Sequence, residues 1–536
     1  MSEAFDVLVV GSGHNALITA AYLAKAGHAV GVFERRPVVG GAVCTQDDLI
    51  PGYQIDVGSS AHVMIHSTPV IEELDLAAYG LEYLPMDPWA FYPETAPSGD
   101  GPGFQPTGRF LQFHNDVDAT CQSIAQFSAR DAEAYARFVK DWGALNEGVF
   151  DVFLKPPTAW NLVRTMAGRQ LGGSNRVDMV RKLMGPYGQL VTETFESEVL
   201  RTAIIWLAAQ SGPHPAELAS GDFAGWHAMY HKSGMKRAKG GSGALTQALK
   251  RRILADGGSV FENAPVRRIR TASNGRVSGI ELEDGTAYEG KAVVAGCHVL
   301  TTLNTLLADT PAADPLRERA QHLRLGNGFG MIVRCAMEGL PAYPGMELDE
   351  RGVGPGHRGL QLLCPSRDYL DAAHADFLGY RPPDKPVPLV MTFSALDDTL
   401  APSGKHVMFV WGQYHPYELR NGEDWDSIEQ READKLIDAV EAYAPGTRDK
   451  VIDRYVQTPL GIERLHGLLR GNVMHLEMSF DQMFLFRPMP ELAEYRVPQV
   501  PGLYLTGAST HPGGGVWGAS GYNTAQTLLR DRKRWR

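Results

Sequence analysis

Long apolar runs and paired cysteines are both missing from this chain of 536 residues. No uninterrupted apolar run approaches the roughly 18 residues that a membrane-spanning helix needs. The cysteines are dispersed and none forms a CxxC pair, which excludes a disulfide framework and a redox-active dithiol and favours a reducing compartment. The first predicted strand begins within a few residues of Met1, so we expect no signal peptide. These features predict a cytoplasmic protein, and a peripheral contact with a membrane stays open.

Basic charge and several catalytic signatures are also scarce. Lysine and arginine number 51 against 62 aspartates and glutamates, and the resulting charge of −11 argues against a nucleic-acid binder. There is no P-loop, GxSxG elbow or zinc ribbon, so kinase and hydrolase functions are not expected. His227 and His231 have the spacing of a metal pair on a helix, but no third ligand is evident and we predict no metal site.

The chain opens on a stretch, Phe5 to Glu34, that is typical of a dinucleotide-binding βαβ unit. A buried strand, a glycine turn, a helical pattern from about residue 15 to 25 and a second strand follow in order. Gly11 permits the tight turn, Gly13 lets the backbone approach a pyrophosphate, and the small Ala16 lets the helix pack closely. The helix N-terminus faces the phosphates, and the Glu34 carboxylate can accept the ribose hydroxyls.

Further glycine-rich turns continue this pattern at both ends of the chain. Gly41 belongs to a second turn that approaches the cofactor, and residues 57–60 form a turn that can lie along a flavin. Val266 begins a strand whose backbone could meet an adenine edge. A strand over 503–506, a glycine-rich loop and a helix over about 516–529 repeat the opening order near the end. A helix N-terminus there would stabilise negative charge on a reduced flavin. We find no second GxGxxG after a strand, and therefore no separate nicotinamide-binding domain.

Three separated segments, VVGSGHNAL, KGGSGALTQAL and LYLTGASTHPGGGVWGASGYNTA, together resemble the phytoene desaturase-related flavoproteins. That family includes carotenoid desaturases and isomerases, retinol saturase and proteins with a pyridine nucleotide-disulphide oxidoreductase domain. The resemblance implies FAD bound through Gly11, Gly13, Glu34, Arg35, Gly41, Ala42, Val266, Gly507 and Val516. The full set of predicted cofactor-binding residues adds Ser12, Asn15, Ala16, Ser59, Ser60, Gly514 and Gly515. Ala508 and Ser509 stand where many flavoproteins carry an acidic residue, so the resemblance leaves that contact open.

We therefore predict an α/β fold with a Rossmann-like FAD-binding domain of the glutathione-reductase or amine-oxidase type, built from separated segments. An inserted α+β substrate domain and a helical cap complete it. The predicted order is a cofactor segment 1–75, a cap and substrate segment 76–225, a cofactor segment 226–310, a substrate-domain sheet 311–455 and a cofactor segment 456–536. The apolar piece 150–166 is either an interfacial membrane helix or an interior helix or loop.

The candidate catalytic side chains lie near the cofactor segments. The stretch NVMHLEMSFDQ alternates as a strand does, which would set His475 and Glu477 on one face, as an acid or base or simply as solvated residues. His511 and His62 follow the two flavin-facing turns and either handle protons or hold those turns in place. Arg487 pairs with the flavin edge or a carboxylate, or forms an ordinary salt bridge.

These residues predict an FAD-dependent oxidoreductase that desaturates, oxidises or isomerises a hydrophobic, unsaturated small molecule of carotenoid or terpenoid type. Hydride would pass to flavin N5, and oxygen or a quinone would be the electron acceptor. An amine or alcohol oxidase on the same fold is the enzymatic alternative. A binding or escort module without turnover is an alternative of another class, since a fold does not determine a function.

Overall fold

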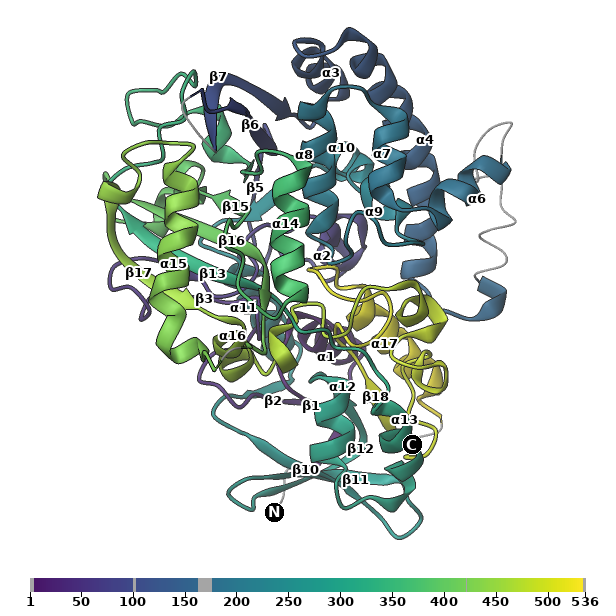
Figure 1. Ribbon diagram of the computed structural model, residues 1–536. Coiled ribbons are helices and arrows are strands. Elements are labelled where there is room, and N and C mark those ends of the chain that lie inside the picture. The colour runs from purple at the N-terminus through teal and green to yellow at the C-terminus, as the bar shows by residue number, and fades with distance from the viewer. Residues whose placement is uncertain (1–3, 100–102, 162–175, 421, 534–536) are drawn as a thin grey trace.

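The predicted opening unit forms the centre of a seven-stranded sheet in the computed structural model, which describes residues 4–99, 103–161, 176–420 and 422–533 (Figure 1). The parallel strands of this sheet are β18 (Leu503–Leu505), β12 (Ala287–Ala295), β1 (Ala4–Val10), β2 (Val30–Phe33) and β9 (Ser259–Phe261). Residues 7–10 of β1 are all buried, because helices and loops cover both faces of the sheet. The βαβ prediction is confirmed, and so is the strand near the C-terminus.

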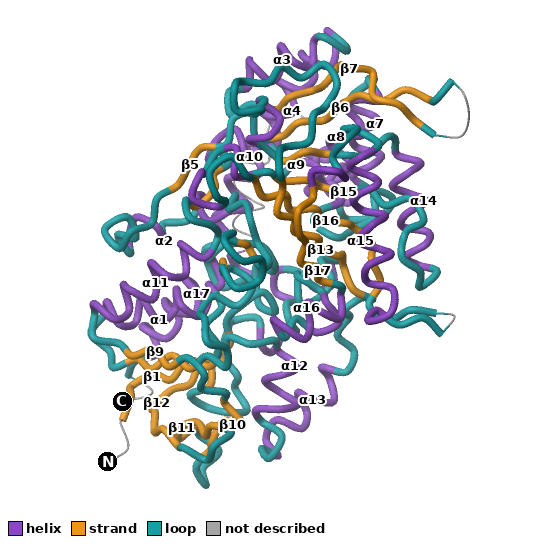
Figure 2. Tube along the Cα trace, turned by 90° about the vertical axis from the view of Figure 1, so that its left-hand side faces the viewer, coloured by secondary structure: helices purple, strands orange, loops and turns teal. Residues whose placement is uncertain are grey.

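Two helices from opposite ends of the chain pack together on this sheet. They are α1 (His14–Lys25) and α17 (Ala519–Asp531), and α11 (Gly243–Ala255) lies on the other side of α1 (Figure 2). The side chain of Asn15 accepts a hydrogen bond from the Gly521 amide at 3.0 Å, and Thr19 donates one to the Gly521 carbonyl. The last helix begins three residues later than predicted, because Gly518 has a φ of 77° and is not helical.

An antiparallel extension prolongs the first sheet at its far edge. β10 (Val266–Thr271) pairs with β11 (Val277–Leu282), which pairs with β12. The strand predicted to begin at Val266 is therefore confirmed, and Val266 itself lines the large cavity described below.

A second seven-stranded sheet stands above the first in Figure 1. Its strands, in spatial order, are β17 (Val451–Gln457), β13 (Gly328–Met337), β16 (His406–Pro416), β15 (Pro388–Met391), β14 (Leu360–Leu362), β6 (Ala90–Pro97) and β7 (Phe104–Phe113). α15 (Trp425–Glu441), α14 (Arg367–Leu378) and α16 (Pro459–His466) lie beside this sheet. Because β14 pairs with β6, this sheet unites strands from the predicted segments 76–225 and 311–455.

One long helix and several shorter ones form a cap over one side of the second sheet (Figure 1). They are α3 (Val117–Ala125), α4 (Ala129–Phe153), α6 (Arg176–Met184), α7 (Tyr187–Thr194), α8 (Glu198–Ala209), α9 (Gly221–Gly225) and α10 (Ala228–Ser233). The sequence pattern over 116–141 and over 177–210 predicts a helix in each stretch, but both stretches are interrupted in the structure. Ser128 caps α4 by accepting a hydrogen bond from the Asp131 amide, and the Gly185-Pro186 pair ends α6.

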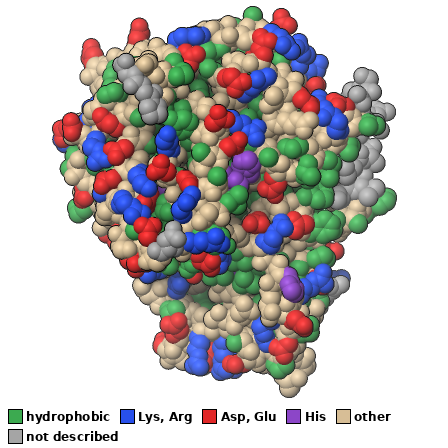
Figure 3. Space-filling model, viewed as in Figure 1, with side chains coloured by type: hydrophobic (Ala, Val, Ile, Leu, Met, Phe, Trp, Pro, Cys, Tyr) green, Lys and Arg blue, Asp and Glu red, His purple; other side chains and the backbone are tan. Residues whose placement is uncertain are grey.

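The described part of the piece 150–166 lies partly in the protein interior. Phe150 and Phe153, on the last turn of α4, are 6% and 2% exposed and pack on the ring of Trp517 at centroid distances of 5.2 and 5.1 Å. Trp160 is 73% exposed, and residues 162–166 lie outside the described residues. The face shown in Figure 3 mixes acidic and basic side chains over both parts of the molecule. Among the described residues, no helix combines the length and apolarity required to cross a bilayer.

Candidate functional site

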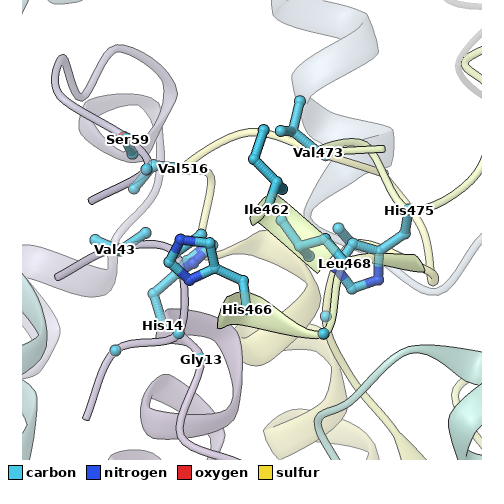
Figure 4. Close-up of a pocket in the computed structure, with 18 of the residues that line it drawn as sticks. Gly13, His14, Val43, Ser59, Ile462, His466, Leu468, Val473, His475 and Val516 are labelled. Atoms are coloured by element: carbon cyan, nitrogen blue, oxygen red, sulfur yellow. The ribbon is translucent and has the colours of Figure 1, made fainter. Parts of the chain in front are cut away.

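A large cavity of about 930 Å³ is lined by residues of both sheets. Its size lies near the upper end of the range for cofactor and small-molecule sites. Every residue predicted to bind the cofactor lines this cavity, from the glycine turn after β1 to the glycine-rich loop before α17. Figure 4 shows side chains from these two ends and from residues 462–475 converging on it. The folding of the chain therefore brings the separated motifs to one place.

The opening glycine turn leaves room for a pyrophosphate. Gly11 adopts a φ of 84°, which a side chain would strain, and turns the chain from β1 into α1. A Cβ placed on Gly13 would meet no protein atom within 4 Å, so it would project into open cavity space. Gly13 also caps α1 without any side-chain hydrogen bond to the first helical amides. Those amides and the helix dipole form the anion site that a pyrophosphate requires.

Glu34 lies at the end of β2, lines the cavity and is only 6% exposed. One carboxylate oxygen accepts hydrogen bonds from the amide and the hydroxyl of Ser12, at 3.0 and 2.6 Å. The other accepts one from the Arg36 amide at 2.9 Å. A carboxylate offers about four acceptor positions, so one remains for a ribose hydroxyl. Glu34 thus also holds the glycine turn in place, a second role that the sequence pattern did not indicate.

His475 is the catalytic candidate that the structure places in the cavity wall. The segment around it is not a strand, so the predicted alternation over 474–481 is wrong: His475 has a φ of 66° and its neighbours form turns. Its ring stacks on His298 at 5.0 Å, and its Nδ1 lies 2.9 Å from the hydroxyl of Ser509. Burial lowers the pKa of His475 well below its ordinary value, so the ring is neutral at pH 7.

The tautomer of His475 follows from its neighbours. The Ser509 oxygen already accepts a hydrogen bond from the Val299 amide at 3.1 Å. A hydroxyl oxygen can accept two hydrogen bonds, so this bond alone does not decide the tautomer. Among the described residues, however, Nδ1 of His475 is the one acceptor that the buried Ser509 hydroxyl contacts. The hydroxyl proton therefore goes to Nδ1, and the proton of the neutral ring stays on Nε2. His475 therefore carries a hydrogen-bond donor at this part of the wall, not a free base.

Arg487 and Glu477 lie outside the set of residues that line the cavity. Arg487 is fully buried and donates to backbone carbonyls, including that of Ala508 at 2.8 Å and that of Met474 at 2.6 Å. Burial without a carboxylate partner lowers its pKa to about 9. Glu477 pairs with Arg324 at 2.9 Å, with its side chain 41% exposed. Arg487 thus organises the loop behind the cavity, and Glu477 belongs to a surface ion pair.

His511 and His62 also lie outside the lining set, each behind the turn that it follows. His511 is buried between the rings of Phe153 and Phe484, and burial lowers its pKa to about 4. Its Nε2 lies 3.3 Å from the Val152 carbonyl. His62 Nε2 lies 2.7 Å from the hydroxyl of Ser242. The geometry favours the structural alternative for both rings.

Three lining histidines, His14, His298 and His466, were not among the predicted site residues. His14 stands directly after Gly13 in the glycine motif, where a side chain faces the ligand, so its position was the available signal. His466 ends α16, and nothing in its neighbouring sequence points to the cofactor segments. Burial lowers the pKa of His14 to about 4 and that of His466 to about 3. Both rings are therefore neutral at pH 7.

The part of the cavity wall that comes from the second sheet, the cap and the loop before α17 has no charged side chain. Its aromatic residues include Trp226, Phe329, Phe409, Trp411 and Trp517. The lining residues with charged side chains come from other elements, namely Glu34, Arg35, Arg36, Glu283, Glu463 and Arg464. The cavity thus combines polar groups suited to a cofactor with an aromatic wall suited to an apolar molecule.

The paired histidines of the cap serve packing. The ring of His227 stacks on Tyr135 and Phe138 at 5.9 and 5.3 Å, and the Nε2 of His231 lies 2.8 Å from the Tyr135 hydroxyl. No cluster of three or more metal-ligating side chains occurs within the residues that the structure describes.

Comparison with known proteins agrees with this geometry. The profile of the flavin containing amine oxidoreductase family matches residues 17–411. The chain belongs to this family. FAD is therefore its cofactor, and the open glycine turn, the uncapped helix and the lining by every predicted contact residue fit that group. The protein is accordingly an FAD-dependent oxidoreductase.

Individual relatives cover almost the whole chain. The pyridine nucleotide-disulfide oxidoreductase domain-containing protein 2 of Rattus norvegicus is 32% identical over 99% of this chain and 94% of its own length. A lycopene-forming phytoene desaturase of Pantoea ananas is 27% identical over 98% and 99%. The crystal structure of an oxidoreductase from Methanosarcina mazei is 18% identical, covers 98% of this chain and 99% of its own, and superposes with a TM-score of 0.61. The last comparison supports the fold alone.

Proposed function

We propose that this oxidoreductase dehydrogenates a hydrophobic, unsaturated small molecule of carotenoid or terpenoid type, with oxygen or a quinone as the electron acceptor. The observation that carries the proposal is the aromatic wall that the second sheet and the cap contribute to the cavity, where no lining residue has a charged side chain. The similarity to a phytoene desaturase supports the same substrate class. Desaturation, oxidation and isomerisation share this requirement for an apolar pocket, and we favour desaturation.

FAD, when bound, supplies the acceptor for a hydride that leaves a substrate carbon. The protein positions the cofactor and the substrate and keeps water out of the cavity. Gly13 and the uncapped end of α1 hold the pyrophosphate, and Glu34 holds the ribose. The aromatic side chains exclude water and orient an apolar substrate by shape, with few titratable groups. His475 keeps its proton on Nε2 and offers a hydrogen bond at the cavity wall.

An amine oxidase is the alternative that the family description suggests. A protonated amine buried against the aromatic wall would need a carboxylate close by, because an unpaired buried charge is strongly disfavoured. The carboxylates that line the cavity are Glu34, Glu283 and Glu463, and two of them are engaged elsewhere. Glu34 holds the glycine turn, and Glu463 accepts a hydrogen bond from the Arg470 amide at 2.6 Å. An uncharged substrate fits this distribution better.

The test is anaerobic mixing of the purified yellow holoenzyme with detergent-solubilised polyenes and terpenoids, and in parallel with amines and alcohols. We expect the visible flavin absorbance to bleach with unsaturated hydrocarbons, and to return on addition of air or a soluble quinone. Val473→Asp would place a carboxylate in the wall and should abolish bleaching, whereas the matched variant Val473→Ala should retain it. Bleaching by amines alone would overturn the proposal.

A further inference from the structure

A second, much smaller cavity of about 20 Å³ lies behind the turn formed by residues 56–60. The centre of a water-sized sphere can move through this volume, so the cavity also admits a somewhat larger monatomic ion. Two arginine side chains, Arg237 and Arg334, line it together with one carboxylate, Asp56, and the rings of Phe393 and Phe409. Both arginines are only 2% exposed and each lies over one of these rings, at 4.7 and 5.0 Å from the ring centroids.

Each arginine has hydrogen-bonding capacity left over. Arg334 donates through Nε and Nη2 to the backbone carbonyls of Asp56 and Val57. Arg237 donates through Nη1 to a carboxylate oxygen of Asp56 at 2.7 Å and to the Ser60 carbonyl at 3.0 Å. Nη1 of Arg334 and Nε of Arg237 are buried and have no hydrogen-bond partner among the described residues. Guanidinium groups can only donate, so both atoms need an acceptor.

The carboxylate of Asp56 cannot be that acceptor. One of its oxygens accepts hydrogen bonds from the Thr45 hydroxyl and the Ser242 amide, both at 2.8 Å. The other accepts from the Ser60 hydroxyl at 2.8 Å and from Arg237 at 2.7 Å. These four bonds use about all the acceptor positions of a carboxylate.

Charge and hydrogen bonding both select an anion for this cavity. Two buried guanidinium groups face one carboxylate, which leaves one positive charge without a partner among the lining residues. A water molecule could accept from the arginines and donate to Gln54 or Ser60, but it would leave the excess positive charge without a partner. A monovalent anion accepts hydrogen bonds only, and it also neutralises the excess charge. We propose that a chloride-sized anion binds between Arg237 and Arg334.

The small cavity shares part of its wall with the large one. Ser60, Met391 and Phe409 line both. The anion would hold the two arginines against the back of the turn that forms the cofactor wall. Arg237 and Arg334 are therefore positioning residues for that turn, and the proposal does not depend on the identity of the substrate.

Bromide is the probe that locates this site directly, because it scatters X-rays anomalously. Crystals of the holoenzyme would be soaked in sodium bromide, and the anomalous map would be calculated at the bromine absorption edge. We expect a peak within hydrogen-bonding distance of Nη1 of Arg334 and Nε of Arg237. A water-like density without anomalous signal at this position would overturn the proposal.

A solution measurement uses the thermal unfolding midpoint of the holoenzyme in sodium chloride and in sodium gluconate at equal ionic strength, because gluconate is too large for the cavity. We expect chloride to raise the midpoint by ~1–2 °C at about tenfold saturation. Arg334→Met leaves the Arg237–Asp56 pair neutral and should remove the chloride effect. Arg351→Met, which removes an arginine with a 67% exposed side chain, should keep it. No chloride effect in the unmodified protein, or one that persists in Arg334→Met, would overturn the proposal.

Discussion

The Ser509 hydroxyl oxygen lies 2.9 Å from Nδ1 of His475, and this contact fixes which nitrogen of the ring carries the proton. The hydrogen bond that Ser509 accepts from the Val299 amide leaves its hydroxyl proton free to point at the imidazole. A loop residue before α17 thereby controls the hydrogen-bonding character of a side chain in the cavity wall.

Ser509→Ala should therefore slow turnover without releasing FAD. Loss of one hydrogen bond to the ring is worth about 1–1.5 kcal/mol, or about tenfold in rate. The comparison is the rate of flavin bleaching under saturating substrate. Ser123→Ala is a matched control, because the Ser123 hydroxyl accepts a backbone hydrogen bond at 2.8 Å in the cap and lies outside the lining set. An unchanged rate in Ser509→Ala would remove His475 from the mechanism.

Gly13→Val should block FAD binding and spare the fold. The φ of Gly13 is −56°, which valine can adopt, and its added atoms would enter open cavity space. They would occupy the space that the pyrophosphate needs, so we expect the dissociation constant of FAD to rise at least ~10-fold, about 1.4 kcal/mol.

The retained flavin is measured after gel filtration, from the absorbance ratio of flavin to protein. Gly143→Val is the control, because a Cβ at Gly143 also meets no atom within 4 Å but stands on α4 away from the cavity lining. A fully yellow Gly13→Val protein would show that the cofactor lies elsewhere.

Glu34→Gln should weaken FAD binding more than Glu283→Gln, although both carboxylates line the cavity. The amide group cannot accept from both Ser12 and Arg36, so one buried donor loses its partner at a cost of about 1–3 kcal/mol. Titration of the apoproteins with FAD gives the two dissociation constants. Equal values would mean that Glu34 does not organise the glycine turn.

The predicted cofactor-binding residues all line one cavity, because the signals that identify them are local in the sequence. A strand, a glycine turn and a helix within thirty residues identify Gly11, Gly13 and Glu34, and the same order recurs before α17. The remainder depends on contacts between distant residues. The alternating residues around His475 predict a strand. In the structure, Arg487 donates hydrogen bonds to the backbone carbonyls of this segment and Glu477 pairs with Arg324 at the surface, so the segment forms turns.

The composition of the second sheet also could not be predicted from local sequence patterns. β14 pairs with β6 although about 270 residues separate them, so the predicted segment boundary between cap and sheet could not show that both belong to one layer. The cap helices were predicted as longer units because the apolar pattern continues across their ends. The signals that end them, the N-cap Ser128 and the Gly185-Pro186 pair, are weaker in the sequence than that pattern.

Acid should destabilise the protein through its buried histidines, and His227 offers the clearest test. Burial lowers its pKa from 6.5 to about 3, and its Nε2 has no partner among the described residues. The unfolded chain then takes up a proton that the folded protein refuses, so stability is complete above about pH 6.5 and falls as the pH drops towards about 3. At about pH 5 this one ring should account for roughly 2 kcal/mol of lost unfolding free energy.

His227→Phe keeps the aromatic stack on Tyr135 and Phe138 and removes the titration. The variant should lose about 1 kcal/mol at every pH, because the backbone hydrogen bond of His227 is gone. Between about pH 7 and about pH 5, however, its unfolding free energy should fall less than that of the unmodified protein. Urea unfolding at both pH values measures this fall for each protein. An equal fall in the two proteins would show that the ring is protonated in the folded protein and that its burial does not contribute to acid sensitivity.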